Sequence, residues 1–346
     1  MREIGYAIVG LGYGSTRCST VVQTPGSRLA AVVDADPARA ARFGDTHDVP
    51  AFTRIEDALA REDVDVVAIY VPTGLHLPLA QQAIEAGKHL LITKPMETTL
   101  ARADAITSAA AAAGVEVFSE HYLRYYPDNL RAKRAIDDGL LGDLVLGEFA
   151  FKCYRPEAYY LADGAWRQTI ELNGGGIVMN QAIHAIDQLT WLMGRPTSVT
   201  ALVATFGMEL PVENTAVATL TMQSGAIATL VTTSTYRTTS GMDDMYGGGY
   251  TTRTEINGLL GSLSLIDSEV VMERLSTGRL PDAAEAAPNV FADVTAALTD
   301  PGYHSVTLVR GGQARLALEV AHAIYESGRV GAPVRLDGAA VFAGNP

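Results

Sequence analysis

The stretch from Ile4 to Ser15, IGYAIVGLGYGS, decides the fold. Its first six residues are mostly apolar and predict a buried strand that ends at Val9. The glycine-rich run Gly10-Leu11-Gly12-Tyr13-Gly14 follows and leads into a helical stretch. The first glycine permits a tight turn, and the second lets backbone N–H groups approach a pyrophosphate at the positive end of a helix. We therefore predict a dinucleotide-binding loop, although Ser15 occupies the usual third glycine position and Gly14 comes one residue early.

An acidic residue stands where such a loop needs a partner for ribose. The next predicted strand, Leu29–Val33, ends directly before Asp34, about 20 residues after the glycine loop. A carboxylate there accepts hydrogen bonds from both ribose hydroxyls and repels a 2′-phosphate, so NAD is favoured over NADP. Arg39 lies close by and leaves phosphate binding open. The alternative is a structural glycine turn in some other α/β domain.

The first ~120 residues alternate short β-branched runs with Ala-rich helical stretches, the pattern of a parallel sheet covered by helices. We expect residues 1–121 to form a Rossmann domain with a doubly wound parallel sheet that binds NAD. The expected strands are Ile4–Val9, Leu29–Val33, Val64–Val71, His89–Ile92 and Val115–Ser119, and the expected helices are Pro37–Phe43, Leu77–Ala86 and Leu100–Ala113.

Residues 122–346 contain segments of alternating apolar and polar residues with few helical stretches between them. This pattern predicts an α/β domain with a large, open, mostly antiparallel sheet. The Gly-rich segment Gly241–Tyr250 is typical of a mobile loop near a site, and Asp282–Pro288 of a surface excursion. The expected strands are Val145–Phe151, Val199–Phe206, Ala216–Met222 and Ala226–Ser234, and the expected helices are Asp128–Asp138, Asn180–Met193 and Gly312–Ser327.

Composition narrows the class of protein. The chain has 346 residues, 48% of them apolar, which suffices for two cores without disulfides or a structural metal. Its two cysteines, Cys18 and Cys153, fit a reducing compartment, and the charged N-terminus favours the cytoplasm over secretion or a membrane. A net charge of −13 disfavours nucleic acid and anionic membranes as partners. A cationic substrate such as an amino sugar remains a minority alternative.

A lysine stands at the end of a predicted strand. Thr93-Lys94-Pro95 directly follows His89–Ile92, and ligands of open parallel sheets bind beyond the carboxyl ends of the strands. A lysine before proline is usually a surface residue, but this position directs it toward the cofactor cleft. Pro72 and Thr73 occupy the equivalent end of the preceding strand, and we expect them, with His76, to flank the nicotinamide.

A polar stripe follows the run Gly174-Gly175-Gly176. If the next residues form one α-helix, Asn180, His184 and Asp187 share a face. Histidine can take or give the proton of an alcohol near neutral pH, and a lysine can stabilise the alkoxide that results. Gly194 is expected to end this helix. The opposite face is apolar, and its side chains expected to be buried are Ile183, Ile186, Leu189 and Met193.

These motifs resemble the Gfo/Idh/MocA family, named after glucose–fructose oxidoreductase and inositol dehydrogenase. The resemblance covers essentially the whole chain and rests on the glycine loop, Lys94-Pro95, and the glycine triplet followed by His184-Ala185-Ile186-Asp187. The segments Val212–Asn214 and Ala323–Gly328 also fit it. It implies oxidation or reduction of sugar-like substrates by NAD(H), and homodimers or homotetramers built on the open sheet.

The resemblance also implies roles for the site residues. Lys94 and His184 correspond to the catalytic lysine and histidine, and Trp166 and Arg167 to residues that line the cofactor. The implied substrate pocket holds Arg124, Tyr154, Asn180, Gln181, Asp187 and Tyr236.

Two departures from the family pattern refine the expected activity. Thr93 replaces a glutamate next to the lysine, and Asn180 replaces an aspartate common in inositol dehydrogenases. Asparagine cannot take a proton at neutral pH, so acid/base duty falls on His184. The pattern resembles members that oxidise the C3 hydroxyl of a hexose, glycoside, nucleotide sugar or aminoglycoside. Alternatives are an enzyme that retains NAD and oxidises transiently, a cyclitol dehydrogenase, and a non-catalytic dinucleotide sensor.

Overall fold

The computed structural model describes residues 2–237, 249–275, 278–282 and 286–336. The chain divides into two compact units, Met1–His121 with Ala286–Ala314, and Tyr122–Glu285 with Arg315–Pro346. The break after residue 121 coincides with the boundary expected from the sequence. The return of Ala286–Ala314 to the first unit differs from the expected continuous second domain. Among the described residues, no helix combines the length and apolarity needed to cross a bilayer.

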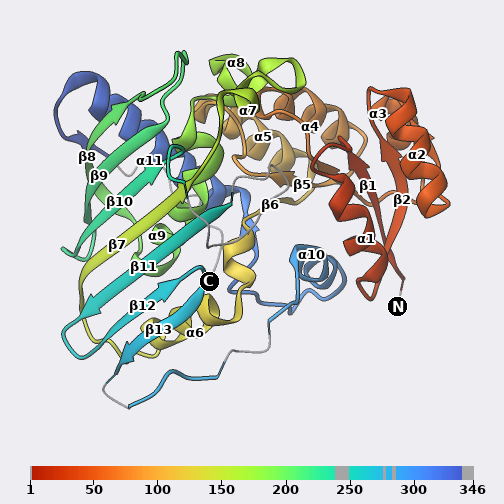
Figure 1. Cartoon of the computed structure of the whole chain (residues 1–346). Coiled ribbons are helices and arrows are strands. Elements are labelled where there is room, and N and C mark those ends of the chain that lie inside the picture. The colour runs from red at the N-terminus through yellow and green to blue at the C-terminus, as the bar shows by residue number, and fades with distance from the viewer. Residues whose placement is uncertain (1, 238–248, 276–277, 283–285, 337–346) are drawn as a thin grey trace. The chain divides into compact units, whose positions relative to one another are not determined.

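The first unit contains a seven-stranded sheet in the order β14-β6-β5-β4-β1-β2-β3 (Figure 1). Strands β1 to β6 run parallel, which confirms the predicted Rossmann sheet, and β14 pairs antiparallel with β6. All residues of β1 are buried, as expected for a parallel sheet covered on both faces. The strands are β1 (Ile4–Val9), β2 (Ser27–Val33), β3 (Ala51–Phe52), β4 (Val66–Ile69), β5 (His89–Thr93), β6 (Val117–Glu120) and β14 (Val309–Arg310).

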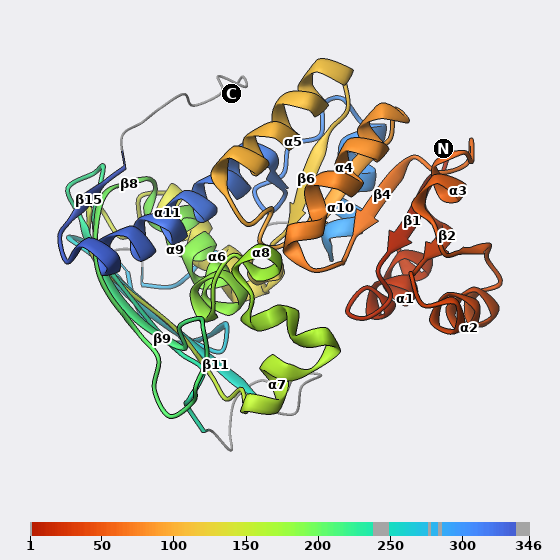
Figure 2. The same ribbon diagram turned by 90° about the horizontal axis from the view of Figure 1, so that it is seen from above.

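Side chains cap the first turns of helices α2 and α5. The Asp36 carboxylate accepts hydrogen bonds from Ala38 and Arg39 N–H at the start of α2, and the Thr99 hydroxyl caps α5. Helices α4 and α5 lie side by side (Figure 2). The sequence analysis missed α10, which packs against β2. The helices are α1 (Ser15–Gln23), α2 (Pro37–His47), α3 (Ile55–Leu59), α4 (His76–Glu85), α5 (Leu100–Ala113) and α10 (Val290–Thr299).

Strand β1 marks the point where the order of the sheet reverses. From β1 the chain adds β2 and β3 on one side, then returns to place β4, β5 and β6 on the other. The loops that follow β1, β4 and β5 therefore emerge at the same carboxyl edge, where ligands of such sheets bind. The glycine loop, Pro72 and Lys94 all belong to this edge.

The second unit contains an eight-stranded sheet in the order β13-β12-β11-β7-β10-β9-β8-β15. Its pairs are antiparallel apart from β7 with β10, which agrees with the predicted mostly antiparallel sheet. The strands are β7 (Leu144–Cys153), β8 (Pro196–Ala204), β9 (Thr215–Met222), β10 (Ile227–Thr233), β11 (Tyr250–Gly258), β12 (Ser262–Ile266), β13 (Glu269–Arg274) and β15 (Val334–Arg335).

Strands β11 to β13 were missed for different reasons. Strand β11 is mostly polar, β12 has only five residues, and the apolar residues of β13 are consecutive rather than alternating. Of the expected loop Gly241–Tyr250, residues 241–248 lie outside the described part of the chain, and Tyr250 begins β11. Residues 283–285 of the expected surface excursion also lie outside it.

Helix α9 packs on the sheet of the second unit through β7 and β10. The predicted helix Asn180–Met193 is wrong at its start, because one π-helical turn, Val178–Ala182, precedes α9 (Ile183–Met193). The predicted stop is confirmed, since Gly194 follows with φ of 86°. The other helices are α6 (Pro127–Asp137), α7 (Glu157–Leu161), α8 (Ile170–Asn173) and α11 (Gly311–Val330).

A buried glutamate fixes the turn before α9. The Glu213 carboxylate accepts hydrogen bonds from Gly176 N–H at 2.7 Å, Val178 N–H at 2.9 Å and the Tyr325 hydroxyl at 2.9 Å. A Cβ on Gly175 would lie 2.1 Å from the Tyr325 hydroxyl, and a Cβ on Gly176 would lie 1.8 Å from the Glu213 carbonyl oxygen. The glycine triplet thus exists to let these groups approach. Burial raises the pKa of Glu213, and the three donors oppose that rise.

We predict that Glu213→Gln destabilises the second unit, because the amide turns an NH₂ group toward a donor whichever way it lies. The expected loss is about 1–3 kcal/mol, which lowers the Tm by about 2–4 °C per kcal/mol. Thermal denaturation followed by circular dichroism measures it. Tyr325→Phe is the matched control, since it removes one donor and leaves both backbone bonds, and it should cost less. A Glu213→Gln variant as stable as the wild type would contradict this role.

Candidate functional site

Glycine is needed at three positions of the first loop for three different physical reasons. Gly10 has φ of 90°, and a Cβ there would lie 2.6 Å from the Tyr70 carbonyl oxygen. A Cβ on Gly14 would lie 2.3 Å from the Gly10 carbonyl oxygen, so Gly14 supplies the close helix–strand approach that the sequence analysis sought at Ser15. At Gly12, apart from the residue itself and its two chain neighbours, no described atom lies within 4 Å of such a Cβ. Gly12 is therefore the point where a ligand can approach the backbone.

These residues fit a dinucleotide. Helix α1 begins at Ser15 with Gly14 as its N-cap, and no side chain caps its first N–H groups. Backbone donors at such a helix start are the usual partners of a pyrophosphate. The cradle at Gly12 and this helix end would hold the phosphates, with Leu11 and Tyr13 in the loop between them.

Asp34 has three partners in the structure. Its carboxylate accepts hydrogen bonds from Leu11 N–H at 2.7 Å and Asp36 N–H at 2.9 Å, which ties the end of β2 to the glycine loop. Arg39 forms an ion pair with it at 3.2 Å. Asp34 is buried, whereas the Arg39 side chain is 40% exposed. The carboxylate thus stands beside the loop, where the sequence predicted it.

A polar cluster beside the glycine loop was missed. Arg17, in the first turns of α1, forms a 2.6 Å ion pair with Glu120 at the end of β6 and lies over the Tyr13 ring at 4.7 Å. The Tyr13 and Tyr70 rings are 6.0 Å apart. An arginine in a helical stretch gives no sequence signal of this long-range pairing. The cluster links three strand ends of the carboxyl edge.

Lys94 lies one residue beyond β5 and is partly buried. The peptide bond between Lys94 and Pro95 is cis. Thr93 ends the strand, and Pro72 and Thr73 stand at the end of β4, as expected. This loop therefore emerges at the carboxyl edge of the first sheet.

His76 connects two loops at the carboxyl edge of the first sheet. Its Nδ1 lies 3.1 Å from the Met96 carbonyl oxygen and its Nε2 lies 3.0 Å from that of Val71, so the ring joins the loops after β4 and β5. Burial lowers the pKa of His76, and the two carbonyl oxygens oppose this shift. Its contacts make His76 a support of the lysine loop, while its predicted cofactor contact stays a prediction.

Glu97 is a buried carboxylate near the lysine that sequence reasoning overlooked. It accepts hydrogen bonds from Leu77 N–H at 2.8 Å and from the Arg102 guanidinium at 2.8 and 2.9 Å. Burial raises the pKa of Glu97, but Arg102 and the backbone donors outweigh burial and lower it. Glu97 therefore stays ionised and anchors the turn three residues after Lys94.

His184 is buried in the first turn of α9, between two aromatic rings. Its ring meets Tyr122 edge-on with centroids 4.3 Å apart, and it stacks toward Phe151 at 6.3 Å. These rings restrict the imidazole to one orientation. Neither aromatic residue was predicted, because Tyr122 and Phe151 are distant from His184 in sequence.

Arg124 and Asp187, both predicted to bind substrate, bind each other. Two hydrogen bonds of 2.8 and 2.7 Å join the guanidinium to the two carboxylate oxygens, and both side chains are buried. Arg124 also lies over the Trp191 ring at 5.3 Å. This bidentate pair holds the segment after β6 against α9.

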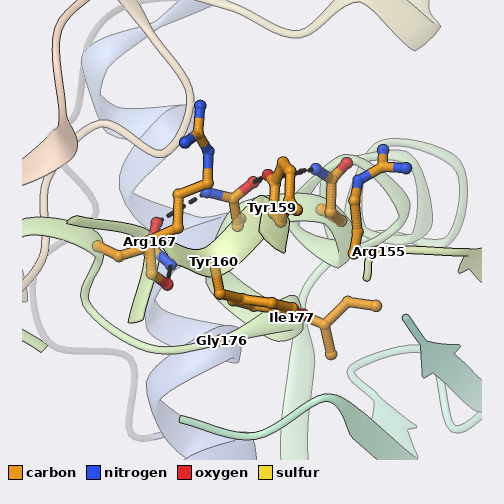
Figure 3. Close-up of a pocket in the computed structure, with 9 residues that line it drawn as sticks. Arg155, Tyr159, Tyr160, Arg167, Gly176 and Ile177 are labelled. Atoms are coloured by element: carbon orange, nitrogen blue, oxygen red, sulfur yellow. Dashed lines mark hydrogen bonds between the residues drawn. The ribbon is translucent and has the colours of Figure 1, made fainter. Parts of the chain in front are cut away.

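Asn180 and Gln181 line a small cavity of about 10 Å³, room for about one water molecule, together with Arg167 (Figure 3). The Tyr159 hydroxyl donates to Asn180 Oδ1 at 3.1 Å, and Asn180 Nδ2 donates to Asn173 Oδ1 at 2.8 Å. Asn180 lies in the π-helical turn and not in α9, so the regular α-helical spacing between Asn180 and His184 is interrupted. The other lining residues are Arg155, Tyr159, Tyr160, Asn173, Gly176 and Ile177, none of them predicted.

The predicted residues Tyr154, Trp166 and Tyr236 do not line this cavity. Trp166 lies 4.8 Å from the Arg167 guanidinium. The Tyr154 hydroxyl accepts a hydrogen bond from Arg237 at 2.6 Å, and Tyr236 is 42% exposed beside Lys152. Within the described ranges, no three His, Cys, Asp or Glu side chains are grouped to hold a metal ion.

Comparison with known proteins identifies the family. Residues 4–121 match the oxidoreductase family with an NAD-binding Rossmann fold, and residues 129–264 match the GFO/IDH/MocA C-terminal domain. A curated relative, scyllo-inositol 2-dehydrogenase (NADP⁺) of Bacillus subtilis, is 31% identical over 45% of this chain and 42% of its own length. The chain spans 40% to 63% of the length of the first curated relatives it matches.

Two solved structures cover almost the whole chain. The WlbA dehydrogenase of Bordetella pertussis, in complex with NADH and UDP-GlcNAcA, is 26% identical with a TM-score of 0.86, over 98% of this chain and 100% of that one. The aldose-aldose oxidoreductase of Caulobacter crescentus is 26% identical with a TM-score of 0.82, over 97% and 100%.

These matches confirm the resemblance found in the motifs, including its two-part architecture. The first family covers the sheet that carries the glycine loop and Lys94, and the second covers most of the sheet on which α9 packs. The chain belongs to the GFO/IDH/MocA family of oxidoreductases, with an NAD-binding Rossmann fold followed by the C-terminal domain of that family.

Proposed function

We propose that the protein is an NAD(H)-dependent oxidoreductase acting on a secondary ring alcohol of a sugar-like substrate. The substrate class is a hexose, glycoside, nucleotide sugar or aminoglycoside, with C3 as the reacting carbon. His184 acts as the acid or base for the hydroxyl proton, and Lys94 stabilises the alkoxide. One observation carries the proposal. In a chain of an oxidoreductase family, Lys94 stands at the end of a strand and His184 is buried against an aromatic ring.

The named relatives support the substrate class. The WlbA dehydrogenase structure contains a nucleotide sugar together with NADH, and the Bacillus relative acts on an inositol. Both ligands carry ring hydroxyls. A cyclitol substrate is the nearest alternative within this class, and Asn180 in place of an aspartate favours a hexose over it.

The chain's residues divide the work by their chemistry. Bound NAD supplies the hydride acceptor or donor. The Lys94 ammonium donates a hydrogen bond to the substrate oxygen and stabilises the charge that develops there. His184 receives the hydroxyl proton or returns it, while Tyr122 and Phe151 keep the ring in place. Asn180 orients a neighbouring hydroxyl, because an amide can both donate and accept.

A second candidate is an enzyme that retains NAD and couples the oxidation of one sugar to the reduction of another, or cleaves a glycoside by transient oxidation. Similarity to the aldose-aldose oxidoreductase favours the sugar–sugar reaction. Copurification of NAD with the protein, and turnover without net NADH, would support this candidate over a freely exchanging dehydrogenase.

We further propose that a second copy of the chain covers the open face of the second sheet, giving a homodimer or homotetramer. Leu202 and Val217 are cross-strand partners on this face and are 78% and 45% exposed. Val231 continues the same row beside Val217. Such an apolar row is typical of an interface. Cys18 and Cys153, buried and not disulfide-bonded, support action in the reducing cytoplasm.

We predict that Lys94→Ala lowers kcat by about 10²-fold or more, since the alkoxide loses its charged donor. NAD⁺ affinity, measured by fluorescence titration, should stay within a few-fold. Lys94→Arg serves as the charge-retaining control and should recover part of the activity. Unchanged kcat in Lys94→Ala would remove Lys94 from the mechanism.

We predict that His184→Gln removes most of the pH dependence of kcat between pH 5 and 8, because glutamine fills a similar volume without titrating. Steady-state rates across that range measure the effect. Tyr122→Phe keeps the ring that packs on His184 and should retain the wild-type profile. A wild-type pH profile in His184→Gln would assign the proton transfer to another group.

We predict that Asp34→Ala weakens NAD⁺ binding more than NADP⁺ binding, because it removes the ribose acceptor and frees Arg39 from its ion pair. The double variant Asp34→Ala/Arg39→Ala should lose the relative gain in NADP⁺ affinity. Titration of each cofactor against each variant provides the comparison. Equal weakening of both cofactors by Asp34→Ala would mean that Asp34 serves only to hold the glycine loop.

A further inference from the structure

The ends of β4 and β6 place two buried polar side chains on one face of the first sheet. Ile69 of β4 pairs with Ile92 of β5, and Ile92 pairs with Ser119 of β6. Tyr70 and Glu120 each follow by one residue, and both are buried. Equivalent positions of neighbouring parallel strands point to the same face of a sheet. Tyr70 and Glu120 therefore share a face at the carboxyl edge.

Tyr70 also packs against the glycine loop. A Cβ on Gly10 would lie 2.6 Å from the Tyr70 carbonyl oxygen, and a Cβ on Gly14 would lie 3.0 Å from the Tyr70 Cβ. The Tyr13 and Tyr70 ring centroids are 6.0 Å apart. Burial raises the pKa of Tyr70 well above its usual value, and the charge of Glu120 adds to the rise. The Tyr70 hydroxyl therefore stays neutral and adds no charge beside the loop.

One guanidinium group joins the glycine loop to the end of β6. Arg17 follows Tyr13 by four residues, donates a hydrogen bond to its hydroxyl and lies 4.7 Å from the centre of its ring. The same guanidinium forms the 2.6 Å ion pair with Glu120. The two side chains are 20% and 8% exposed, so water screens this pair less than a pair at the surface. Tyr13 is therefore tied through Arg17 to the edge of the sheet.

The position of Tyr13 matters for a ligand of the loop. Tyr13 stands between Gly12, where a ligand can approach the backbone, and Gly14, the N-cap of α1. The N–H groups of this stretch are the donors expected for a pyrophosphate. A shift of Tyr13 would move these donors, and hydrogen bonds weaken steeply when they are misaligned. The charges of Arg17 and Glu120 balance each other, so the pair adds little net attraction for phosphates.

We propose that Arg17 and Glu120 are positioning residues for the cofactor, which act through Tyr13 to hold the N–H groups of the glycine loop where the pyrophosphate binds. Desolvation offsets much of the attraction within a buried ion pair, so the main effect of this pair is to fix the groups that it joins. The inference rests on the NAD(H) binding in the proposed function. It makes affinity for the dinucleotide depend on an acid outside the loop, at the end of β6.

Two substitutions with opposite effects on charge test this role in the full-length protein. Arg17→Met removes both contacts of the guanidinium, and Glu120→Gln weakens the ion pair but keeps the shape of the side chain. Positioning predicts weaker NAD⁺ binding in both variants, by at least about 5-fold in Arg17→Met. Attraction of phosphates by charge alone predicts tighter binding in Glu120→Gln, because a negative charge is removed. Isothermal titration measures the affinities, and thermal melting checks that each variant folds.

Two further comparisons identify how the effect reaches the cofactor. In an Arg17→Met background, Glu120→Gln should change the affinity by less than about 2-fold, since Glu120 acts through Arg17. ADP-ribose carries the pyrophosphate without the nicotinamide and should lose as much affinity as NAD⁺ in Arg17→Met. Arg28→Met is the matched control, because it breaks a pair with Asp63 near the start of β2, at the amino edge of the same sheet. It should leave both affinities unchanged.

Each outcome decides the proposal. Wild-type NAD⁺ affinity in Arg17→Met, or tighter binding in Glu120→Gln, overturns it. A loss confined to NAD⁺ and absent with ADP-ribose would assign the cluster to the nicotinamide end and also overturn it. A wild-type protein that binds neither ligand overturns both this role and the proposed function. The expected affinities in a protein that oxidises no sugar would instead count against the proposed function and leave the positioning role standing.

Discussion

The Glu213 carboxylate receives three hydrogen bonds, two from the backbone after the glycine triplet and one from Tyr325. These bonds fix where the π-helical turn begins, and the turn fixes where Asn180 and His184 stand. Distant parts of the chain meet here, since Glu213 precedes β9 and Tyr325 lies in α11. Only glycines permit the approach, because a Cβ at Gly175 or Gly176 would overlap these partners. The geometry of the candidate site in the second unit therefore depends on one buried acid.

In the first unit, too, buried polar side chains bond to backbone groups, here at the carboxyl edge of the sheet. Asp34 accepts a hydrogen bond from Leu11 N–H, so the residue proposed to bind ribose also shapes the loop proposed to bind phosphates. Glu97 and His76 support the lysine loop in a comparable way, by bonds to backbone groups of neighbouring turns. Buried polar groups are costly unless fully bonded, and these groups are placed where strand ends must hold a defined shape.

The sequence predicted features that depend on local pattern. Buried runs of β-branched residues located β1, β2, β4 and β5, and glycine spacing located the dinucleotide loop. It missed features that depend on long-range contacts. Strand β11 is mostly polar, and Arg155 and Arg167 come together around the Tyr159 ring only in the folded chain. The π-helical turn could not be foreseen, because nothing in the local sequence of residues 178–182 distinguishes it from an α-helix.

The central chemical claim is that a ring alcohol is oxidised with NAD as the hydride acceptor. The direct measurement incubates the purified protein with NAD⁺ and a panel of neutral sugars, uronates, sugar phosphates and nucleotide sugars. NADH absorbance and product mass are followed together. NADH should form with at least one sugar of the panel, together with a ketone product that has lost two hydrogens. Absence of any oxidised product, under conditions where NAD⁺ is shown to bind, would contradict it.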